Sequence, residues 1–275
     1  MPVELTIHDG EPWYLSPDVW TITGNDPDAP PGQPIAGRRA RLKALVRNDG
    51  NEDVEDALVR FYWANPSLGV TRETANPLGT ARVTLEAHGQ AEVLCPTSWS
   101  VQYLNEGHLC VLAEAFHPQL DQLPEDTNFS VPTDRHVAQR NLIVAQARIE
   151  EPTLLGFEVH NPFPSEQEFT VTAEAKDPSI LYQLSETSGI DPELLQQGGR
   201  VELIGFTGTG CPTPGELEEA KHELERVGLG GHEITGFNLA GRLEGSVGLV
   251  SISQTLDGKQ VGGMSLLLVQ GQQGT

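Results

Sequence analysis

The side chains best suited to chemistry are carboxylates, and they gather in two turn-rich loops at residues 25–32 and 49–56. The carboxylates concerned belong to Asp26, Asp28, Asp49, Asp53 and Asp56. Carboxylate oxygens are the ligands that a hard cation such as Ca²⁺ prefers. Neither loop has the residue order of an EF-hand, so ordinary solvated turn residues remain the alternative to a calcium site.

A glycine-rich stretch at residues 205–210, Gly-Phe-Thr-Gly-Thr-Gly, is the strongest enzyme-like motif. It follows an apolar strand and precedes a capped helix, as a phosphate-binding loop does. However, Cys211 and Pro212 stand where such a loop needs lysine and then serine or threonine, and the dinucleotide pattern lacks its third glycine. We therefore interpret the stretch as a connection between elements.

Other catalytic patterns are also incomplete. Ser246 lacks the glycine two residues before it that a serine-hydrolase elbow requires, because Glu244 stands there. The histidines are scattered and form no HExxH pair. We therefore predict a protein without catalytic residues or a bound cofactor, and leave Ca²⁺ as the cation to test.

Two further groups of residues are candidates for contacts with other molecules. Trp13 and Tyr14 lie beside a proline-rich loop, and we expect them to be the exposed aromatic pair, which suits either a protein contact or a carbohydrate platform. A helix is expected over residues 214–227, because Thr213 and Glu216 have capping-box spacing and apolar residues recur at helical spacing. Its other face would be acidic, with Glu218, Glu219 and Glu225.

The formal net charge of −22 limits the partners. Nucleic acid and anionic membranes need clustered cations, so neither is expected as a partner. The sequence begins without a basic and apolar leader, and no stretch reaches the roughly 18 apolar residues of a membrane span. We therefore expect a soluble protein, either cytoplasmic or released as part of an assembly. Cys95 and Cys110 are expected to be reduced and buried, with a bridge between them as the alternative.

The elements that position these residues are mostly strands. In residues 39–48 and 57–63, apolar side chains alternate with polar or charged ones, and a polar turn at 49–51 separates the two segments. A period of two places one set of side chains on a buried face. With abundant turn residues (Gly 29, Pro 20), this pattern predicts an all-β protein.

The second half repeats the opening unit in weaker form. A strand again ends in Val-x-Asn, at Asn161 as at Asn48, and a polar turn and an alternating strand follow. We therefore predict two tandem immunoglobulin-like Greek-key β-sandwiches, at residues 1–147 and 148–275, with the strand near residue 144 closing the first. The second would carry short helical insertions at about 178–197 and 214–227.

The strand ending Leu45-Val-Arg-Asn-Asp-Gly-Asn51, the alternating strand that follows it, and the strand carrying Cys110 resemble the CARDB family of immunoglobulin-like domains. So does the segment Val137-Ala-Gln-Arg-Asn-Leu-Ile-Val144. The resemblance covers about residues 1–147. It implies a seven-stranded Greek-key sandwich that serves as an adhesion, spacer or assembly module and brings no catalytic residues.

Together these patterns predict a non-catalytic bacterial protein that acts through protein–protein contacts or self-assembly, as a component of a larger assembly. The alternative is a calcium- or carbohydrate-binding module.

Overall fold

The computed structural model describes residues 2–65, 67–101, 109–125, 129, 131–149, 151–208, 213–218, 220 and 223–271. The chain forms two compact units. Unit 1 comprises residues 1–65, 71–141 and 183–190, and unit 2 comprises residues 66–70, 142–182 and 191–275. Each unit therefore contains a short segment from the other half of the sequence.

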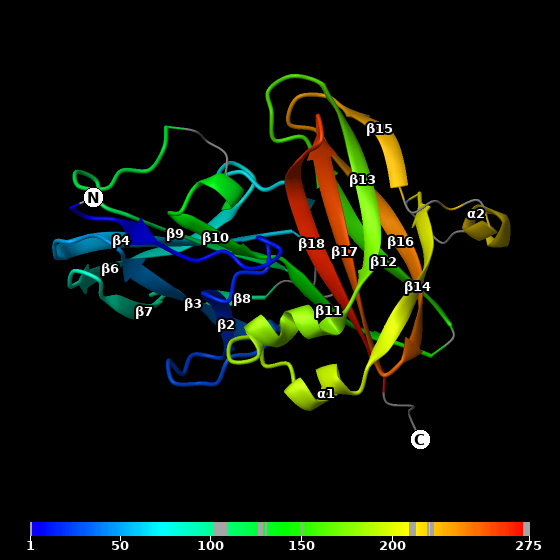
Figure 1. The fold of residues 1–275 in the computed structure, drawn as a ribbon, viewed down its shortest axis with the longest axis horizontal. Helices are drawn as coiled ribbons and strands as arrows, with labels where there is room; N and C mark the ends of the chain where they lie inside the picture. Colours follow the sequence, from blue (N-terminus) through cyan, green and yellow to red (C-terminus); the bar gives the residue numbers. More distant parts are fainter. Residues whose placement is uncertain are drawn as a thin grey trace. The chain divides into compact units, whose positions relative to one another are not determined.

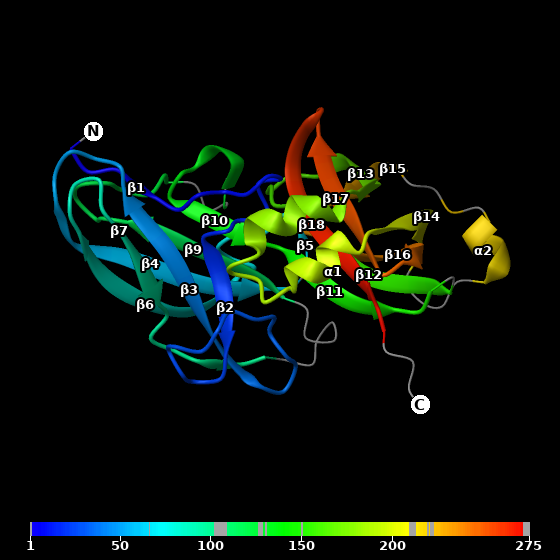
Figure 2. The same ribbon diagram turned by 60° about the horizontal axis from the view of Figure 1, so that its bottom comes forward.

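Unit 1 is a β-sandwich of two sheets. One sheet is built around β3, which pairs with β1, β2, β7 and β8; Figure 2 shows β2 and β3 side by side. The other has the order β10-β9-β4-β6. The elements are β1 (Leu5–Thr6), β2 (Val19–Thr23), β3 (Arg39–Asn48), β4 (Val54–Ala64), β6 (Asn76–Leu85), β7 (Gln90–Leu94), β8 (Trp99–Ser100), β9 (Cys110–Phe116), η2 (Val131–Thr133) and β10 (Val137–Arg140).

Unit 2 is a second sandwich, with sheets ordered β11-β18-β17-β13-β15 and β14-β16-β12-β5. Figure 1 shows β13, β17 and β18 side by side. The elements are β5 (Ser67–Leu68), β11 (Leu142–Ala147), β12 (Pro152–His160), β13 (Gln167–Lys176), η3 (Pro178–Leu184, which ends in unit 1), α1 (Pro192–Gln196), β14 (Gly199–Thr207), α2 (Pro214–Glu218), β15 (Glu223–Leu229), β16 (Ile234–Gly245), β17 (Val247–Leu256) and β18 (Lys259–Gln270). The predicted all-β class with two immunoglobulin-like sandwiches is confirmed.

Alternation along the strands produces the two cores. In β3 the buried side chains are those of Ala40, Leu42, Ala44 and Val46, and they pack against the inner face of β4. The cations between them point away from this core. Burying the side chain of Leu42 or Val46 contributes roughly 1.5–3 kcal/mol to stability, and burying each alanine methyl group contributes roughly 0.8 kcal/mol.

β3 and β4 belong to different sheets, as do β12 and β13. The turn after each Asn is therefore an arch between two sheets and not a hairpin within one. Asn48 and Asn161 are both fully buried. The Oδ1 atom of Asn48 accepts from the N–H of Gly50, and that of Asn161 accepts from Phe163. Both units thus have a buried asparagine with the same hydrogen bond at the turn that joins their two sheets.

The amide nitrogens of the two asparagines complete the arches. Asn48 Nδ2 donates to the carbonyls of Glu52 and Glu86, and Asn161 Nδ2 donates to those of Ser165, Leu229 and Gly230. Each side chain therefore ties its turn to a distant segment and satisfies carbonyls that have no ladder partner there.

Two expectations about the elements are wrong. The segment expected to close the first sandwich divides after Asn141: β10 pairs with β9 in unit 1, whereas β11 pairs in parallel with β18 in unit 2. The helix expected over 214–227 ends at Glu218, and β15 is a strand paired with β13.

A bulge explains the helical spacing in β15. Phe169 faces Val227 and Val171 faces Leu224, so three residues of β15 span two residues of β13. Arg226 takes up the extra residue with a φ of 54°. Leu224 and Val227 can therefore both pack against the core of unit 2, at a spacing that is otherwise typical of a helix. The predicted capping box is present, with Thr213 N–H donating to Glu216 Oε2 over 2.6 Å.

Replacing either arch asparagine with alanine leaves several buried carbonyls and N–H groups unpaired. We expect Asn48→Ala and Asn161→Ala each to lower the free energy of unfolding by about 2–4 kcal/mol, measured by urea denaturation. Asn51→Ala is the matched control, because Asn51 is exposed in the same turn as Asn48. An Asn48→Ala loss no larger than that of Asn51→Ala would contradict this role.

Candidate functional site

A concentrated set of charged side chains lies on the outer face of the sheet that contains β4 and β9. Glu114 of β9 is fully buried within an otherwise apolar strand. Its Oε1 accepts from Tyr62 Oη at 2.6 Å, and its Oε2 lies 2.9 Å from Arg72 Nη2. Arg60 approaches the same carboxylate at 3.4 Å. Two guanidinium groups and one hydroxyl therefore compensate the buried charge.

Aromatic rings cover these arginines. The guanidinium carbon of Arg60 lies 4.5 Å from the ring centre of Phe116, and that of Arg72 lies 5.0 Å from that of Phe129. Burial and the hydrogen bond to Glu114 raise the pKa of Tyr62 well above its usual value. The hydroxyl is therefore held as a donor, and the cluster's geometry fits a fixed structural network.

A second network seals the edge of β1. Asp121 Oδ2 accepts from the N–H of Leu5 at 2.6 Å, and Asp121 Oδ1 binds Arg135 Nη2 at 2.7 Å. Arg135 Nη1 in turn donates to the carbonyl of Leu5. The outward backbone groups of Leu5 are thus satisfied by an ion pair and not by another strand.

His136 links this seal to Asp134. Its Nδ1 lies 2.6 Å from Asp134 Oδ1, and its Nε2 lies 3.2 Å from Asp121 Oδ1. Burial alone would lower the pKa of His136, but the two carboxylates outweigh it and raise the pKa. Burial would likewise raise the pKa of Asp134, but the hydrogen bonds from His136 lower it. Both groups are therefore stabilised in their charged forms.

A third network holds residues 183–190 in unit 1. Arg140 is buried and donates to the carbonyl of Ser16 at 2.8 Å and to the carbonyl and hydroxyl of Thr187 at 2.6 Å each. Gln33 Nε2 donates to Ser188 O. Burial lowers the pKa of Arg140 to about 9, partly offset by Asp18. The guanidinium acts here as a clamp on backbone carbonyls.

The backbone edges of the sheets differ in how they are covered. The edge of β10 is paired by the segment around Leu15, which bridges to Arg140, and Ser16 N–H donates to Gln139 O at 3.0 Å. By contrast, β6 and β14 are the two longest strands that end a sheet. The part of the chain that the structure describes adds no strand beyond them, although α2 lies near β14. These two edges are therefore the candidate contact surfaces.

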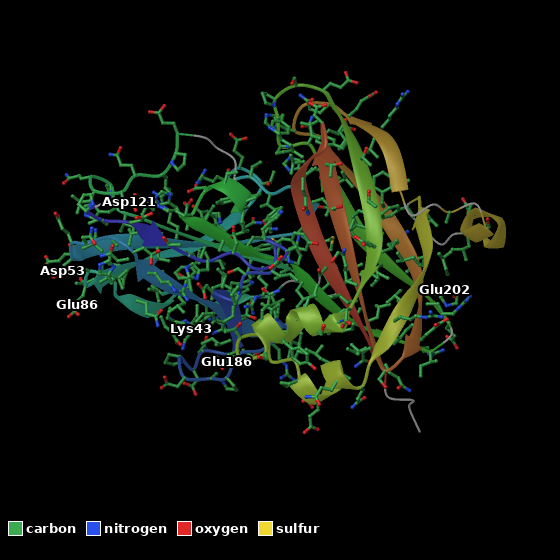
Figure 3. The ribbon with its side chains drawn as sticks, viewed as in Figure 1. Lys43, Asp53, Glu86, Asp121, Glu186 and Glu202 are labelled. Atoms are coloured by element: carbon green, nitrogen blue, oxygen red, sulfur yellow. The ribbon has the colours of Figure 1, made fainter. Side chains whose placement is uncertain are left out.

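The predicted calcium ligands are exposed and have local roles; Asp56 lies in β4 and the other four lie in loops. Asp26 Oδ1 accepts from the N–H of Asp28, Asp53 Oδ1 accepts from that of Ala87, and Asp56 pairs with Arg82 at 3.3 Å. Asp49 is also exposed, and Figure 3 shows Asp53 close to Glu86 at one end of unit 1. Among the described residues, no three histidine, cysteine or acidic side chains are grouped to hold a metal ion. A calcium site in these loops stays a prediction.

The expected exposed aromatic pair is wrong. Tyr14 is 2% exposed, and Trp13 is half-buried with its ring set edge-on to that of Tyr14 at 5.4 Å. Both rings are used in packing because this segment covers the edge of β10. Glu218 ends α2 and Glu225 lies in β15, so they share no helix face, and Glu219 lies outside the described residues. Cys95 and Cys110 are buried free thiols, as expected.

Sequence reasoning missed Glu114, Arg140 and the Asp121–Arg135 pair. One signal was available, because Glu114 is the lone charge in Cys110–Phe116, a strand apolar on both faces. A charge in such a strand requires a buried partner. The partners Arg60 and Arg72 are distant in sequence, and no local pattern identifies them.

The fold and the networks define an all-β, two-sandwich protein whose clustered charges bind one another or the protein's own backbone. The described residues contain no helix that is long and apolar enough to cross a membrane. The chain matches no protein-family model and no curated protein.

Solved structures give weak matches. The CARDB domain of the PF1109 protein of Pyrococcus furiosus, solved in complex with di-metal ions, is 14% identical with a TM-score of 0.30, and the match covers 50% of this chain and 84% of that one. Red sea bream transglutaminase is 12% identical with a TM-score of 0.26, covering 99% of this chain but 32% of that one. The CupB6 tip adhesin of Pseudomonas aeruginosa is 8% identical with a TM-score of 0.25, covering 93% and 99%.

Two of these weak matches are to CARDB domains, the family that the residues of the first half resemble. They say nothing about a ligand or partner of this chain.

The carboxyl group of Asp9 in unit 1 makes a testable contribution to the pH dependence of stability. Its Oδ1 is buried without a hydrogen-bond partner, and burial, aided by Asp134, raises its pKa from 3.8 to about 8. Between these values the folded state binds more protons than the unfolded state, so this group makes stability fall as pH rises. Above pH 8 the folded protein holds a carboxylate whose buried Oδ1 atom has no hydrogen-bond partner.

We expect Asp9→Asn to remove this loss. Because the carboxyl is only partly buried, the variant should be more stable than the parent by about 1–2 kcal/mol at pH 8.5 and equal to it near pH 4. Urea denaturation across this pH range measures the difference. A gap that does not change with pH would show that Asp9 does not titrate in this way.

Proposed function

We propose that this chain is a non-catalytic β-sandwich protein that acts through protein–protein contacts, as a component of a larger assembly. The observation that carries the proposal is that some of its sheet edges are covered and others are not. The edges at β1 and β10 are closed by side chains and by a neighbouring segment, whereas the long edges at β6 and β14 have no further strand among the described residues.

An uncovered edge offers a row of backbone donors and acceptors to another extended segment. Strand addition at such an edge obtains affinity from main-chain hydrogen bonds and specificity from alternate side chains. β6 has ten residues and β14 has nine, so each is long enough for this mode of contact.

The charged clusters support a non-catalytic role. Glu114 is bound by Tyr62 and two arginines, and Arg140 is bound to backbone carbonyls. Groups held in this way stabilise the sandwich, and their hydrogen-bonding capacity is directed at the protein itself.

The experiment is size-exclusion chromatography with light scattering, in Ca²⁺ and in EDTA, together with affinity capture from extracts of the source cells. We expect a defined oligomer or a stoichiometric protein complex whose mass and thermal midpoint are indifferent to EDTA. A monomer that retains no stoichiometric partner would contradict the proposal.

The calcium alternative has its own variant. If Ca²⁺ raises the thermal midpoint and the combined variant Asp49→Asn, Asp53→Asn, Asp56→Asn abolishes that rise, the acidic loop is a metal site and the function moves to calcium binding. Asp26→Asn with Asp28→Asn is the matched variant for the other loop.

A further inference from the structure

Strand β14 carries an alternating pattern of charge at its open edge. Arg200 of β14 faces Glu244 of β16, and Glu202 of β14 faces Arg242 of β16. Both pairs are ionic: Arg200 Nε contacts Glu244 Oε2, and Arg242 Nη1 lies 2.6 Å from Glu202 Oε2. Each of the two cross-strand pairs therefore joins opposite charges, and the member of each pair on β14 is exposed at the edge of the sheet.

The segment that carries these charges is well fixed. It runs from Gly199 to Leu203, before a bulge between Leu203 and Gly205 bends the strand. Between the two charged residues, Val201 is 4% exposed. A Cβ atom on Gly241 or Gly248 would lie within 2.9 Å or 2.7 Å of its methyl groups, so both glycines are required for this close packing. The edge is thus held in one conformation before any partner binds.

We propose, on the basis of the protein-contact function above, that two copies of this chain pair antiparallel through β14 about a two-fold axis at Val201. Pairing through Val201 places Arg200 of one copy opposite Glu202 of the second copy, and the reverse pair forms by symmetry. Across the joined sheets, Glu244 and Arg200 of one copy are then followed by Glu202 and Arg242 of the second copy, and each neighbouring pair has opposite charges. Opposite charges placed directly across an antiparallel pair are stabilising, and like charges are destabilising.

The charge pattern favours this occupant at β14 and not at the other long edge. β6 carries one charged residue, Arg82, so two copies paired there have no opposite charge to offer each other. On β14 the complementary charges are two residues apart, which is the spacing that a two-fold axis between them requires. Figure 3 marks Glu202 on this strand.

The test compares charge variants of the full chain by sedimentation equilibrium over a wide concentration range. Arg200→Glu places glutamate opposite Glu202 of the second copy at two symmetric positions, and we expect it to weaken the dimer by about tenfold or more. Arg82→Glu makes the same change in net charge and breaks an exposed ion pair with Asp56 on the other long edge, so it should leave the dimer unchanged.

A variant in which all four charges are reversed distinguishes a loss of dimer pairing from a loss of folding. Arg200→Glu also breaks the pair with Glu244 within one copy. The fourfold variant Arg200→Glu, Glu202→Arg, Arg242→Glu, Glu244→Arg restores every opposite-sign step at unchanged net charge, and we expect it to recover the parental dimer. Circular dichroism confirms that each variant is folded.

Three results would overturn the β14 dimer: a monomeric parent at all concentrations, a dimer that Arg200→Glu leaves intact, or a folded fourfold variant that stays as weak as Arg200→Glu. None of them by itself removes the proposed function, because a stoichiometric complex with a different protein does not require self-association.

Discussion

The fold depends on one constraint, which is that the chain must cross from one sheet of a sandwich to the other without leaving buried backbone groups unpaired. A buried asparagine meets this constraint at Asn48 in unit 1 and at Asn161 in unit 2. One amide side chain accepts from the turn and donates to carbonyls both nearby and far along the chain. Neither aspartate, which lacks the donor, nor leucine, which lacks both, can do the same.

The buried charges extend the same logic to the edges and the outer face of unit 1. A carboxylate and a guanidinium close the backbone of Leu5, and a second guanidinium fixes carbonyls of two distant segments. These groups replace ladder hydrogen bonds where no strand is present. Buried charged groups therefore stabilise the interior of this protein, in addition to the surface charges that contribute to the net charge of −22.

Much of the fold could be predicted from the sequence because β3, β4 and β13 have clear alternation. β5 could not be, because a two-residue strand has no periodicity and its partner β12 lies about ninety residues away. β15 was misread because its bulge gives Leu224 and Val227 a helical spacing. The candidate contact edges depend on which strands end each sheet, and local patterns carry no such information.

The exchange of segments has a consequence for how the chain is made. Unit 1 lacks its 183–190 segment until the chain has been synthesised to residue 190, and unit 2 takes its β5 strand from residues that emerge early. Neither sandwich can be completed from a contiguous stretch of sequence. A nascent chain therefore cannot finish one unit and then begin the other, and a cut between the two halves would leave each fragment without a piece of its own architecture.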